Sequence, residues 1–123
     1  MELGESREDY LETIYMLTLK GDRGVKSSRI AEEMQLSKPS VSHAVKCLEE
    51  IGYLKKQSTG EILLTEKGKK LGKMIYERHL FFKAFLMKIG VPEKRAGEEA
   101  CRIEHVLSEE SYALFKEYVE NKG

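Results

Sequence analysis

Two short helices separated by a polar turn are indicated between residues 26 and 52, and this pair constrains the fold more than any other stretch of the chain. The first helix is predicted over Ser28–Met34. The second begins in a Ser-Lys-Pro-Ser sequence, where Ser37 or Ser40 is the N-cap. Pro39 suits the first helical turn because its missing N–H has no intrahelical partner to lose. The second helix carries one apolar stripe, formed by Val41, Ala44, Val45 and Leu48.

The outer face of the second helix is small, polar or basic, as in the recognition helix of a helix-turn-helix. Such a helix enters the major groove with its N-terminus first, so that hydroxyl and basic groups meet phosphates and base edges. Amphipathic helix pairs of this kind also occur in all-helical proteins that never contact DNA. The pair alone therefore leaves both interpretations open.

A β-hairpin is predicted directly after the two helices, with strands at Tyr53–Gln57 and Glu61–Leu64 and a turn at Ser58–Gly60. A helix-turn-helix followed by a hairpin with lysines near its tip is a winged helix, which favours DNA binding. The predicted fold class is mainly α: a winged helix-turn-helix with a small β-hairpin wing in residues 1–65, followed by a helical dimerisation domain in residues 66–123. The predicted DNA-binding residues are Lys26, Ser37, Lys38, Ser40, Ser42, His43, Lys46, Lys55 and Lys56.

The distribution of charge agrees with this division, although the net charge of the chain is zero. Residues 20–76 hold twelve basic and seven acidic side chains, a net charge of +5. The net charge is −4 over residues 1–19 and −1 over residues 77–123. Excess positive charge in the predicted winged helix is what a phosphate-binding surface requires, although an ordinary solvated surface can carry as much.

Composition places the chain among compact, water-soluble proteins. Its 123 residues suffice for one domain, or for a small domain with a helical extension. No apolar run approaches the ~18 residues of a membrane span, and the acidic N-terminus does not resemble a secretory signal. The two cysteines lie in different helical contexts, so we expect no disulfide framework and a reducing, cytoplasmic location.

Helical periodicity accounts for most of the remaining sequence. A first helix is predicted over Ser6–Leu19, with Ser6 as its N-cap, and a loop follows at Gly21–Gly24. One long helix is expected from Thr65 to about Ile89, stopped by Gly90. A further helix starts at Val91-Pro92-Glu93 and has an apolar stripe that ends at Leu107; an aromatic helix begins after Ser108. The aromatic helix suggests packing against another subunit or against the long helix.

Cys101, Glu104 and His105 are spaced to lie on one face of a helix. They offer a thiolate, a carboxylate and an imidazole, and a divalent transition metal accepts all three. Asp9 and Glu12, three residues apart on the first helix, and His79 on the long helix could complete the coordination shell. A buried thiol, a surface acid and a capping histidine would give the same local pattern without a metal, and neither zinc-finger spacing nor a metalloprotease motif is present.

An enzyme is not expected. Cys101 and His105 could serve as nucleophile and base, but no nucleophile elbow, oxyanion loop or third orienting residue is recognisable. A phosphate-binding loop and a dinucleotide fingerprint are also absent, so no small-molecule substrate is expected.

Over almost its whole length the sequence resembles the metal-dependent repressor family that includes the diphtheria toxin repressor and the manganese transport regulator. The motifs that carry the resemblance are Glu8-Asp9-Tyr10-Leu11-Glu12-x-Ile14-Tyr15, Ile30-Ala31-Glu32, Ser37-x-Pro39-Ser40-Val41-Ser42, Leu64-Thr65-x-x-Gly68, Arg78-His79 and Glu99-Ala100-Cys101-Arg102-x-Glu104-His105-Val106. The resemblance implies a homodimeric winged-helix repressor that binds a palindromic operator in double-stranded DNA when Fe²⁺ or Mn²⁺ is present, and that controls metal homeostasis genes.

The resemblance also implies which residues hold the metal. The primary site would be formed by Asp9, Cys101, Glu104 and His105, and a neighbouring position would use Glu12 and His79 and share Glu104. Asp9 and Glu12 match the manganese branch of the family, whereas Cys101 matches the iron branch. Lys83 and Gly97 replace two ligands of the iron branch's ancillary site.

The choice of metal stays open between the two branches. A thiolate favours Fe²⁺, and Co²⁺ or Zn²⁺ in vitro, over the harder Mn²⁺, while the carboxylate of Asp9 acts in the opposite direction. A second interpretation is a metal-independent winged-helix module for DNA binding and dimerisation, with an empty or structural-zinc site. A metal storage or trafficking protein is a third, but it would leave the winged helix without a role.

Overall fold

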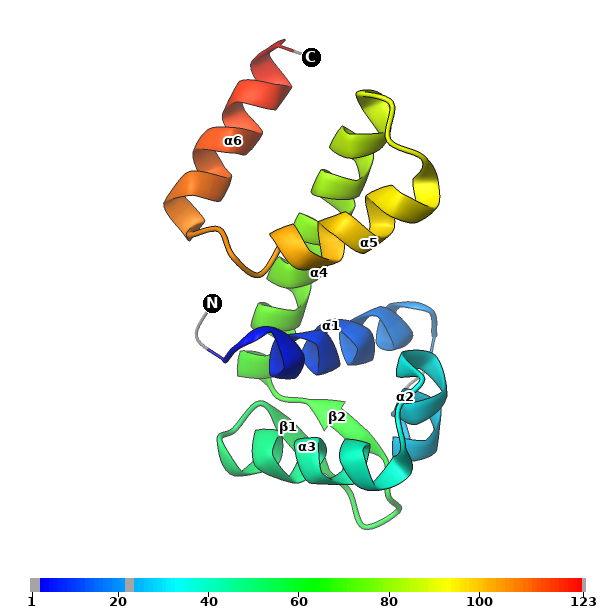
Figure 1. Cartoon of the computed structure of the whole chain (residues 1–123). Coiled ribbons are helices and arrows are strands. Elements are labelled where there is room, and N and C mark those ends of the chain that lie inside the picture. The colour runs from blue at the N-terminus through cyan, green and yellow to red at the C-terminus, as the bar shows by residue number, and fades with distance from the viewer. Residues whose placement is uncertain (1–2, 22–23, 123) are drawn as a thin grey trace. The chain divides into compact units, whose positions relative to one another are not determined.

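The computed structural model describes residues 3–21 and 24–122 and confirms a mainly helical fold with a small antiparallel hairpin (Figure 1). Asp22 and Arg23 of the predicted loop lie outside the described residues. The elements in chain order are α1 (Glu5–Leu19), α2 (Ser27–Met34), α3 (Lys38–Glu50), β1 (Leu54–Lys56), β2 (Ile62–Leu64), α4 (Glu66–Lys88), α5 (Glu93–Ile103) and α6 (Glu109–Lys122).

The chain forms two compact units, Ser6–Tyr76 and the unit of residues 1–5 and 77–123, which meet within α4. The predicted boundary between residues 65 and 66 falls at the start of α4 and stays a prediction.

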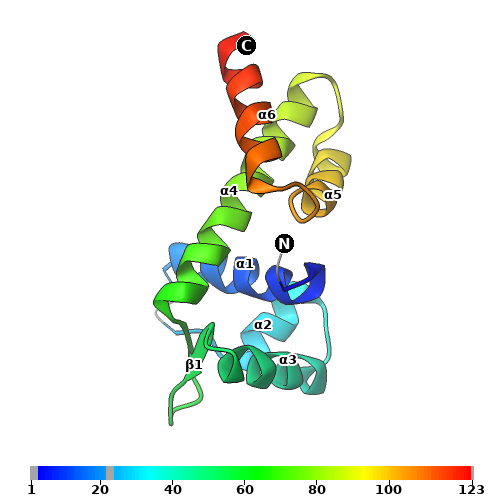
Figure 2. The ribbon, with the colours of Figure 1, turned by 90° about the vertical axis from the view of Figure 1, so that its left-hand side faces the viewer.

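The unit Ser6–Tyr76 contains the predicted winged helix. The Ser37 side chain caps α3 by accepting a hydrogen bond from the Ser40 N–H at 3.3 Å, and Pro39 lies in the first turn of the helix. Between α2 and α3, Gln35 has a φ of +56°, and this left-handed residue ends α2. In the hairpin, Leu54 pairs with Leu64 and Lys56 with Ile62. Figure 2 shows the tip of the hairpin extending past α3.

The core of this unit joins α1 to the helix-turn-helix and the wing. The fully buried side chains include Leu11, Ile14, Leu17, Ile30, Val41, Leu48, Ile62 and Ile75. Glycine lets α4 approach closely at two positions: a Cβ on Gly68 would collide with the carbonyl oxygen of Tyr53, and one on Gly72 would lie 2.9 Å from the carbonyl oxygen of Leu11. The prediction of Ser6 as an N-cap is wrong, because α1 begins at Glu5 and places Ser6 in its first turn.

The second unit contains the end of α4 with α5 and α6. Gly90 has a φ of +110°, and the N–H groups of Gly90 and Val91 donate to the carbonyls of Met87 and Leu86, so the predicted stop of the long helix is confirmed. α4 and α6 contact each other through an aromatic cluster, Phe81, Phe82, Phe85, Tyr112 and Phe115, whose ring centroids lie 5.1–6.0 Å apart. Within the described residues, no helix combines the length and the apolar character that a membrane crossing requires.

Candidate metal centre and DNA-binding surface

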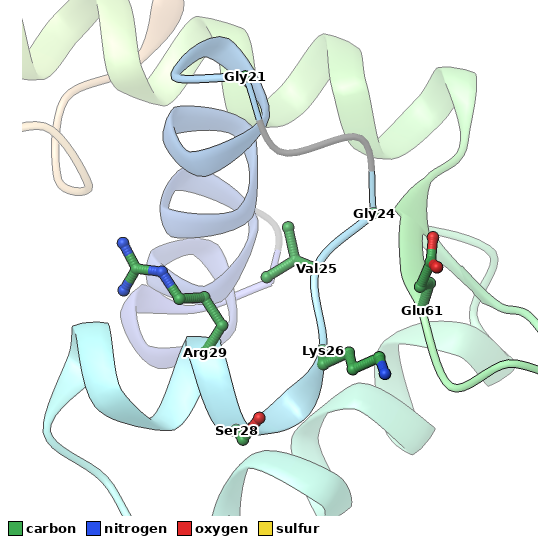
Figure 3. A pocket seen from close by; sticks show the side chains of 7 residues that line it. All are labelled: Gly21, Gly24, Val25, Lys26, Ser28, Arg29 and Glu61. Carbon is green, nitrogen blue, oxygen red and sulfur yellow. The ribbon is translucent and has the colours of Figure 1, made fainter.

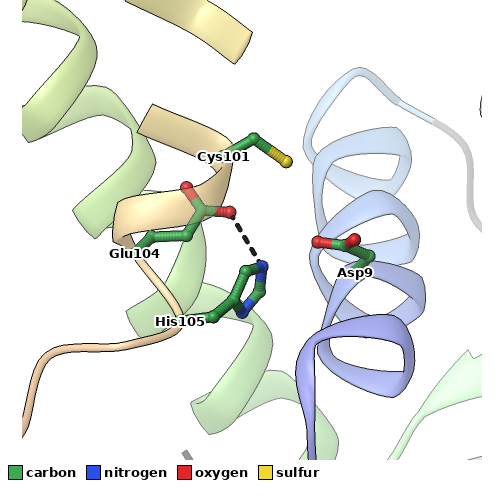
Figure 4. A group of neighbouring side chains, drawn as sticks. All are labelled: Asp9, Cys101, Glu104 and His105. Carbon is green, nitrogen blue, oxygen red and sulfur yellow. Dashed lines mark ion pairs between the residues drawn. The ribbon is translucent and has the colours of Figure 1, made fainter. Parts of the chain in front are cut away.

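Four of the predicted ligands come together in the second unit: His79, Cys101, Glu104 and His105. One donor atom each from Cys101, Glu104 and His105 lies within 4.8 Å of the others (Figure 4). The Glu104 carboxylate lies 2.9 Å from Nδ1 of His79 and 3.4 Å from Nε2 of His105. Glu104 is fully buried and His105 is 5% exposed, so these groups meet where water is largely excluded.

The predicted placement of Cys101, Glu104 and His105 on one face of a helix differs from the structure. Cys101 lies in the last turn of α5, but the helix ends at Ile103, so Glu104 and His105 lie in a turn after it and Leu107 lies beyond it. The N–H groups of His105 and Val106 donate to carbonyls three residues back, which tightens the chain. The three donors still meet, but a turn rather than one helical face brings them together.

The chemistry of the cluster fits a divalent transition metal. A fully buried carboxylate is costly unless cationic or hydrogen-bonding groups compensate its charge, and imidazoles such as the two around Glu104 are a side-chain type that transition metals accept. A thiolate, a carboxylate and imidazoles form a set that Zn²⁺, Co²⁺ or Fe²⁺ accepts. Neutral imidazoles and ionised acids would be needed to hold such an ion.

Asp9 and Glu12 are carried by α1, in the other unit, and are half-buried. Their spacing of three residues places both on one side of α1. Burial raises the pKa of the Tyr10 phenol, which precedes Glu12 on the same helix. That Asp9 and Glu12 are ligands stays a prediction.

All of the predicted DNA-binding residues are exposed on the surface of the first unit. They belong to the α3 N-terminus and outer face, to the wing and to the residue before α2. The Ser37 hydroxyl donates to that of Ser40 at 2.9 Å while it accepts the Ser40 N–H. That these nine residues contact DNA stays a prediction.

Three features of these surfaces were not predicted. The Glu49 carboxylate accepts the Lys56 N–H at 3.1 Å and so joins the end of α3 to the wing. The Cys47 sulfur lies 3.7 Å from Nε2 of His43 on the exposed face of α3. The Arg78 side chain is buried and bonds to the main chain of the candidate ligand Glu104. Its only signal in the sequence was that it directly precedes the predicted ligand His79.

A surface hollow lies near the start of α2 (Figure 3). Figure 3 shows Arg29 pointing away from Lys26, and Arg29 pairs with Glu33 on its own helix at 3.2 Å. The hollow is lined by Gly21, Gly24, Val25, Lys26, Ser28, Arg29 and Glu61. Its described lining residues form no group of metal donors, and none of them belongs to the candidate centre.

Known protein families match both parts of the chain. The family model described as "Iron dependent repressor, N-terminal DNA binding domain" matches residues 2–61, and that described as "Iron dependent repressor, metal binding and dimerisation domain" matches residues 65–122.

Individual relatives support the same match. An uncharacterized HTH-type transcriptional regulator of Methanocaldococcus jannaschii is 36% identical over 119 residues, which cover 96% of this chain and 95% of the relative. The iron-dependent repressor IdeR of Mycobacterium tuberculosis is 38% identical over 110 residues, 89% of this chain and 47% of IdeR. The structure of the manganese regulator SloR aligns with a TM-score of 0.82 and 31% identity, over 93% of this chain and 53% of SloR. The chain therefore spans about half the length of IdeR and SloR.

Proposed function

Because the chain belongs to the iron-dependent repressor family, whose members are metal-dependent regulators of transcription and not enzymes, we propose that it is a metal-activated repressor. The observation that carries the proposal is the convergence of Cys101, Glu104 and His105 in a chain that also has a winged helix with an exposed basic face. The proposal places the protein in the cytoplasm, on double-stranded DNA.

The proposed metal ligands are the cluster residues together with acids of α1. Asp9 would join Cys101, Glu104 and His105, and Glu12 would join His79 at a neighbouring position that shares Glu104. A bound divalent ion would supply the positive charge that allows these carboxylates to approach one another. The thiolate of Cys101 favours Fe²⁺ and the carboxylates favour Mn²⁺, so Fe²⁺ or Mn²⁺ is the proposed physiological ion, with Co²⁺ and Zn²⁺ as ions that bind in vitro.

The proposed mechanism depends on Asp9 and Glu12 being part of the winged-helix unit, since α1 shares its core with α2 and α3. When these acids act as ligands, α1 is held to the unit that carries Cys101 and Glu104. One arrangement of the recognition helices is then favoured, to the extent that this arrangement binds the ion more tightly. Metal binding would therefore raise the affinity for the operator, and operator binding would raise the affinity for the metal by the same factor.

A homodimer on a palindromic operator is the proposed DNA-bound form. Two recognition helices can address half-sites one turn apart, about 34 Å, and so bury more contact than one winged helix can. The second unit exposes large apolar side chains that a second copy could cover: Leu80, Met87, Ile89, Val106, Leu114, Phe115 and Tyr118. The genes controlled would be those of metal homeostasis.

The decisive test compares DNA binding with and without metal. The full chain, purified without added metal, is analysed for bound ions and then titrated with operator-containing DNA in the presence of Mn²⁺, Fe²⁺ or a chelator. We expect operator binding that chelation abolishes, while circular dichroism stays unchanged. Operator binding that survives chelation would favour the alternative, a metal-independent winged-helix protein with an empty or structural-zinc site.

A further inference from the structure

Arg78 is a charged side chain buried in the second unit, with 1% of its surface exposed. Its Nη1 donates to the carbonyl oxygen of Leu107 at 2.7 Å and, at 3.4 Å, to that of Glu104. Its guanidinium carbon lies 4.7 Å from the centre of the Tyr112 ring on α6. Burying a cation is costly unless hydrogen bonds or an aromatic face compensate it, and here Nη1 bonds to the chain that follows α5 while the guanidinium lies on Tyr112.

These contacts hold the part of the chain that carries the candidate ligands. α5 ends at Ile103, so the carbonyls beyond it lack the partners that a continuing helix would supply. Arg78 provides a donor for two of them. The next residue, His79, lies 2.9 Å from the other end of Glu104, its carboxylate. Two consecutive residues of α4 therefore contact Glu104 at its main chain and at its side chain.

We propose that Arg78 is a positioning residue of the metal centre: it fixes the turn of residues 104–107, so that Glu104 and His105 face Cys101 before an ion arrives. Through Tyr112 the same side chain joins this turn to α6. This inference rests on the proposed function, because it assumes that the cluster binds a metal. It adds a residue that supplies no donor atom and yet sets the affinity.

The geometry requires arginine and not merely a positive charge. The planar guanidinium can donate to two carbonyls while its face lies on the Tyr112 ring, whereas a lysine ammonium is a point charge on a flexible stem. Loss of the Nη1 hydrogen bonds and of the ring contact frees the turn, and the ion must then pay the entropy of ordering it. A charge effect alone predicts no change in metal affinity for Arg78→Lys, because lysine keeps the charge.

The test measures Co²⁺ affinity of the full-length chain by absorption titration against a competing chelator. We expect Arg78→Lys to bind Co²⁺ about 10–100-fold more weakly, the range typical of residues that orient ligands. The thiolate-to-cobalt charge-transfer band should persist in Arg78→Lys at saturating Co²⁺, because the donor set is unchanged. Arg95→Lys, an exposed arginine of α5, is the matched control and should bind as the wild type does.

A pair of substitutions at Tyr112 keeps the test valid should Arg78→Lys fail to fold. Tyr112→Leu removes the ring face and should weaken Co²⁺ binding, whereas Tyr112→Phe keeps the ring and should not. Co²⁺ affinity within twofold of the wild type in a folded Arg78→Lys, or equal affinity in both Tyr112 variants where Arg78→Lys is unfolded, would overturn the role of Arg78. Absence of Co²⁺ binding by the wild type would instead overturn the proposed metal centre, and this inference with it.

Discussion

The candidate metal centre depends on Glu104, since both His79 and His105 contact its carboxylate. Removing its charge leaves two imidazoles and a thiol without the anion between them. Glu104→Gln preserves the volume of the side chain, so the packing of this fully buried position should be kept.

For Glu104→Gln we expect a loss of Co²⁺ or Mn²⁺ affinity of at least the ~10–100-fold seen for residues around a metal, together with loss of metal-dependent operator binding. Helix content by circular dichroism should match the wild type. Glu99→Gln, on the exposed side of α5, is the control and should bind normally. A full metal response in Glu104→Gln would place the site elsewhere.

The sequence predicts the donor residues but not the environment of Arg78. The donor residues were recognisable because Cys101, Glu104 and His105 have characteristic chemistry and close spacing. The burial of Arg78 was not recognisable from the sequence, because arginine is ordinarily a surface residue. Only its tertiary contacts with the Leu107 carbonyl and with Tyr112 reveal its environment.

At the scale of single elements, α3 and the hairpin present the surface proposed to bind DNA. Lys46 is exposed on the outer face of α3 and would meet a phosphate. Lys46→Ala should therefore weaken binding to all DNA sequences alike and reduce the salt dependence of binding by about one unit. Fluorescence anisotropy over a series of salt concentrations measures both. Lys94→Ala, on α5, should change neither, and an unchanged salt slope for Lys46→Ala would mean that its side chain does not contact phosphate.

The approach of α4 to its neighbours gives a stability prediction. In Gly68→Ala the new Cβ would collide with the carbonyl oxygen of Tyr53, and backbone cannot move aside cheaply. We expect the free energy of unfolding in urea to fall by about 1–3 kcal/mol. Gly97→Ala is the matched control: its Cβ would lie 3.9 Å from the Lys83 side chain, so the higher helix propensity should stabilise α5 by about 0.5–1 kcal/mol. If the two changes had equal effects on the free energy of unfolding, helix propensity and not the close approach of Gly68 to Tyr53 would determine the stability of both variants.

The bounds of the elements were predictable wherever a local signal marks them. Ser37 caps α3 and Gly90 ends α4 as expected, because each makes its own hydrogen bonds within a few residues. The end of α5 was not predictable. The residues after Ile103 carry no glycine or proline to stop a helix, and the carbonyls of Glu104 and Leu107 accept from Arg78, which lies 26 and 29 residues earlier in the chain.

At the scale of the whole molecule, the proposed homodimer needs an apolar surface, and α6 exposes Leu114, Phe115 and Tyr118. Leu114 is 67% exposed, so Leu114→Glu costs the folded monomer little but would place charge in the interface. We expect sedimentation equilibrium to give a dimer for the wild type at micromolar concentration and a shift toward monomer for Leu114→Glu. Glu117→Gln on the same helix should stay dimeric. A wild-type monomer with metal and DNA present would contradict the proposal.

The hydrogen bond from the Lys56 amide to the Glu49 carboxylate has a consequence for exchange with solvent. An amide at the end of the first strand of an exposed hairpin would ordinarily exchange its hydrogen for deuterium quickly, but this one is protected only while the wing stays attached to the end of α3. Its exchange rate therefore records how often the wing detaches. The amide thus serves as a natural probe of whether metal, added before any DNA, changes the rigidity of the DNA-reading surface.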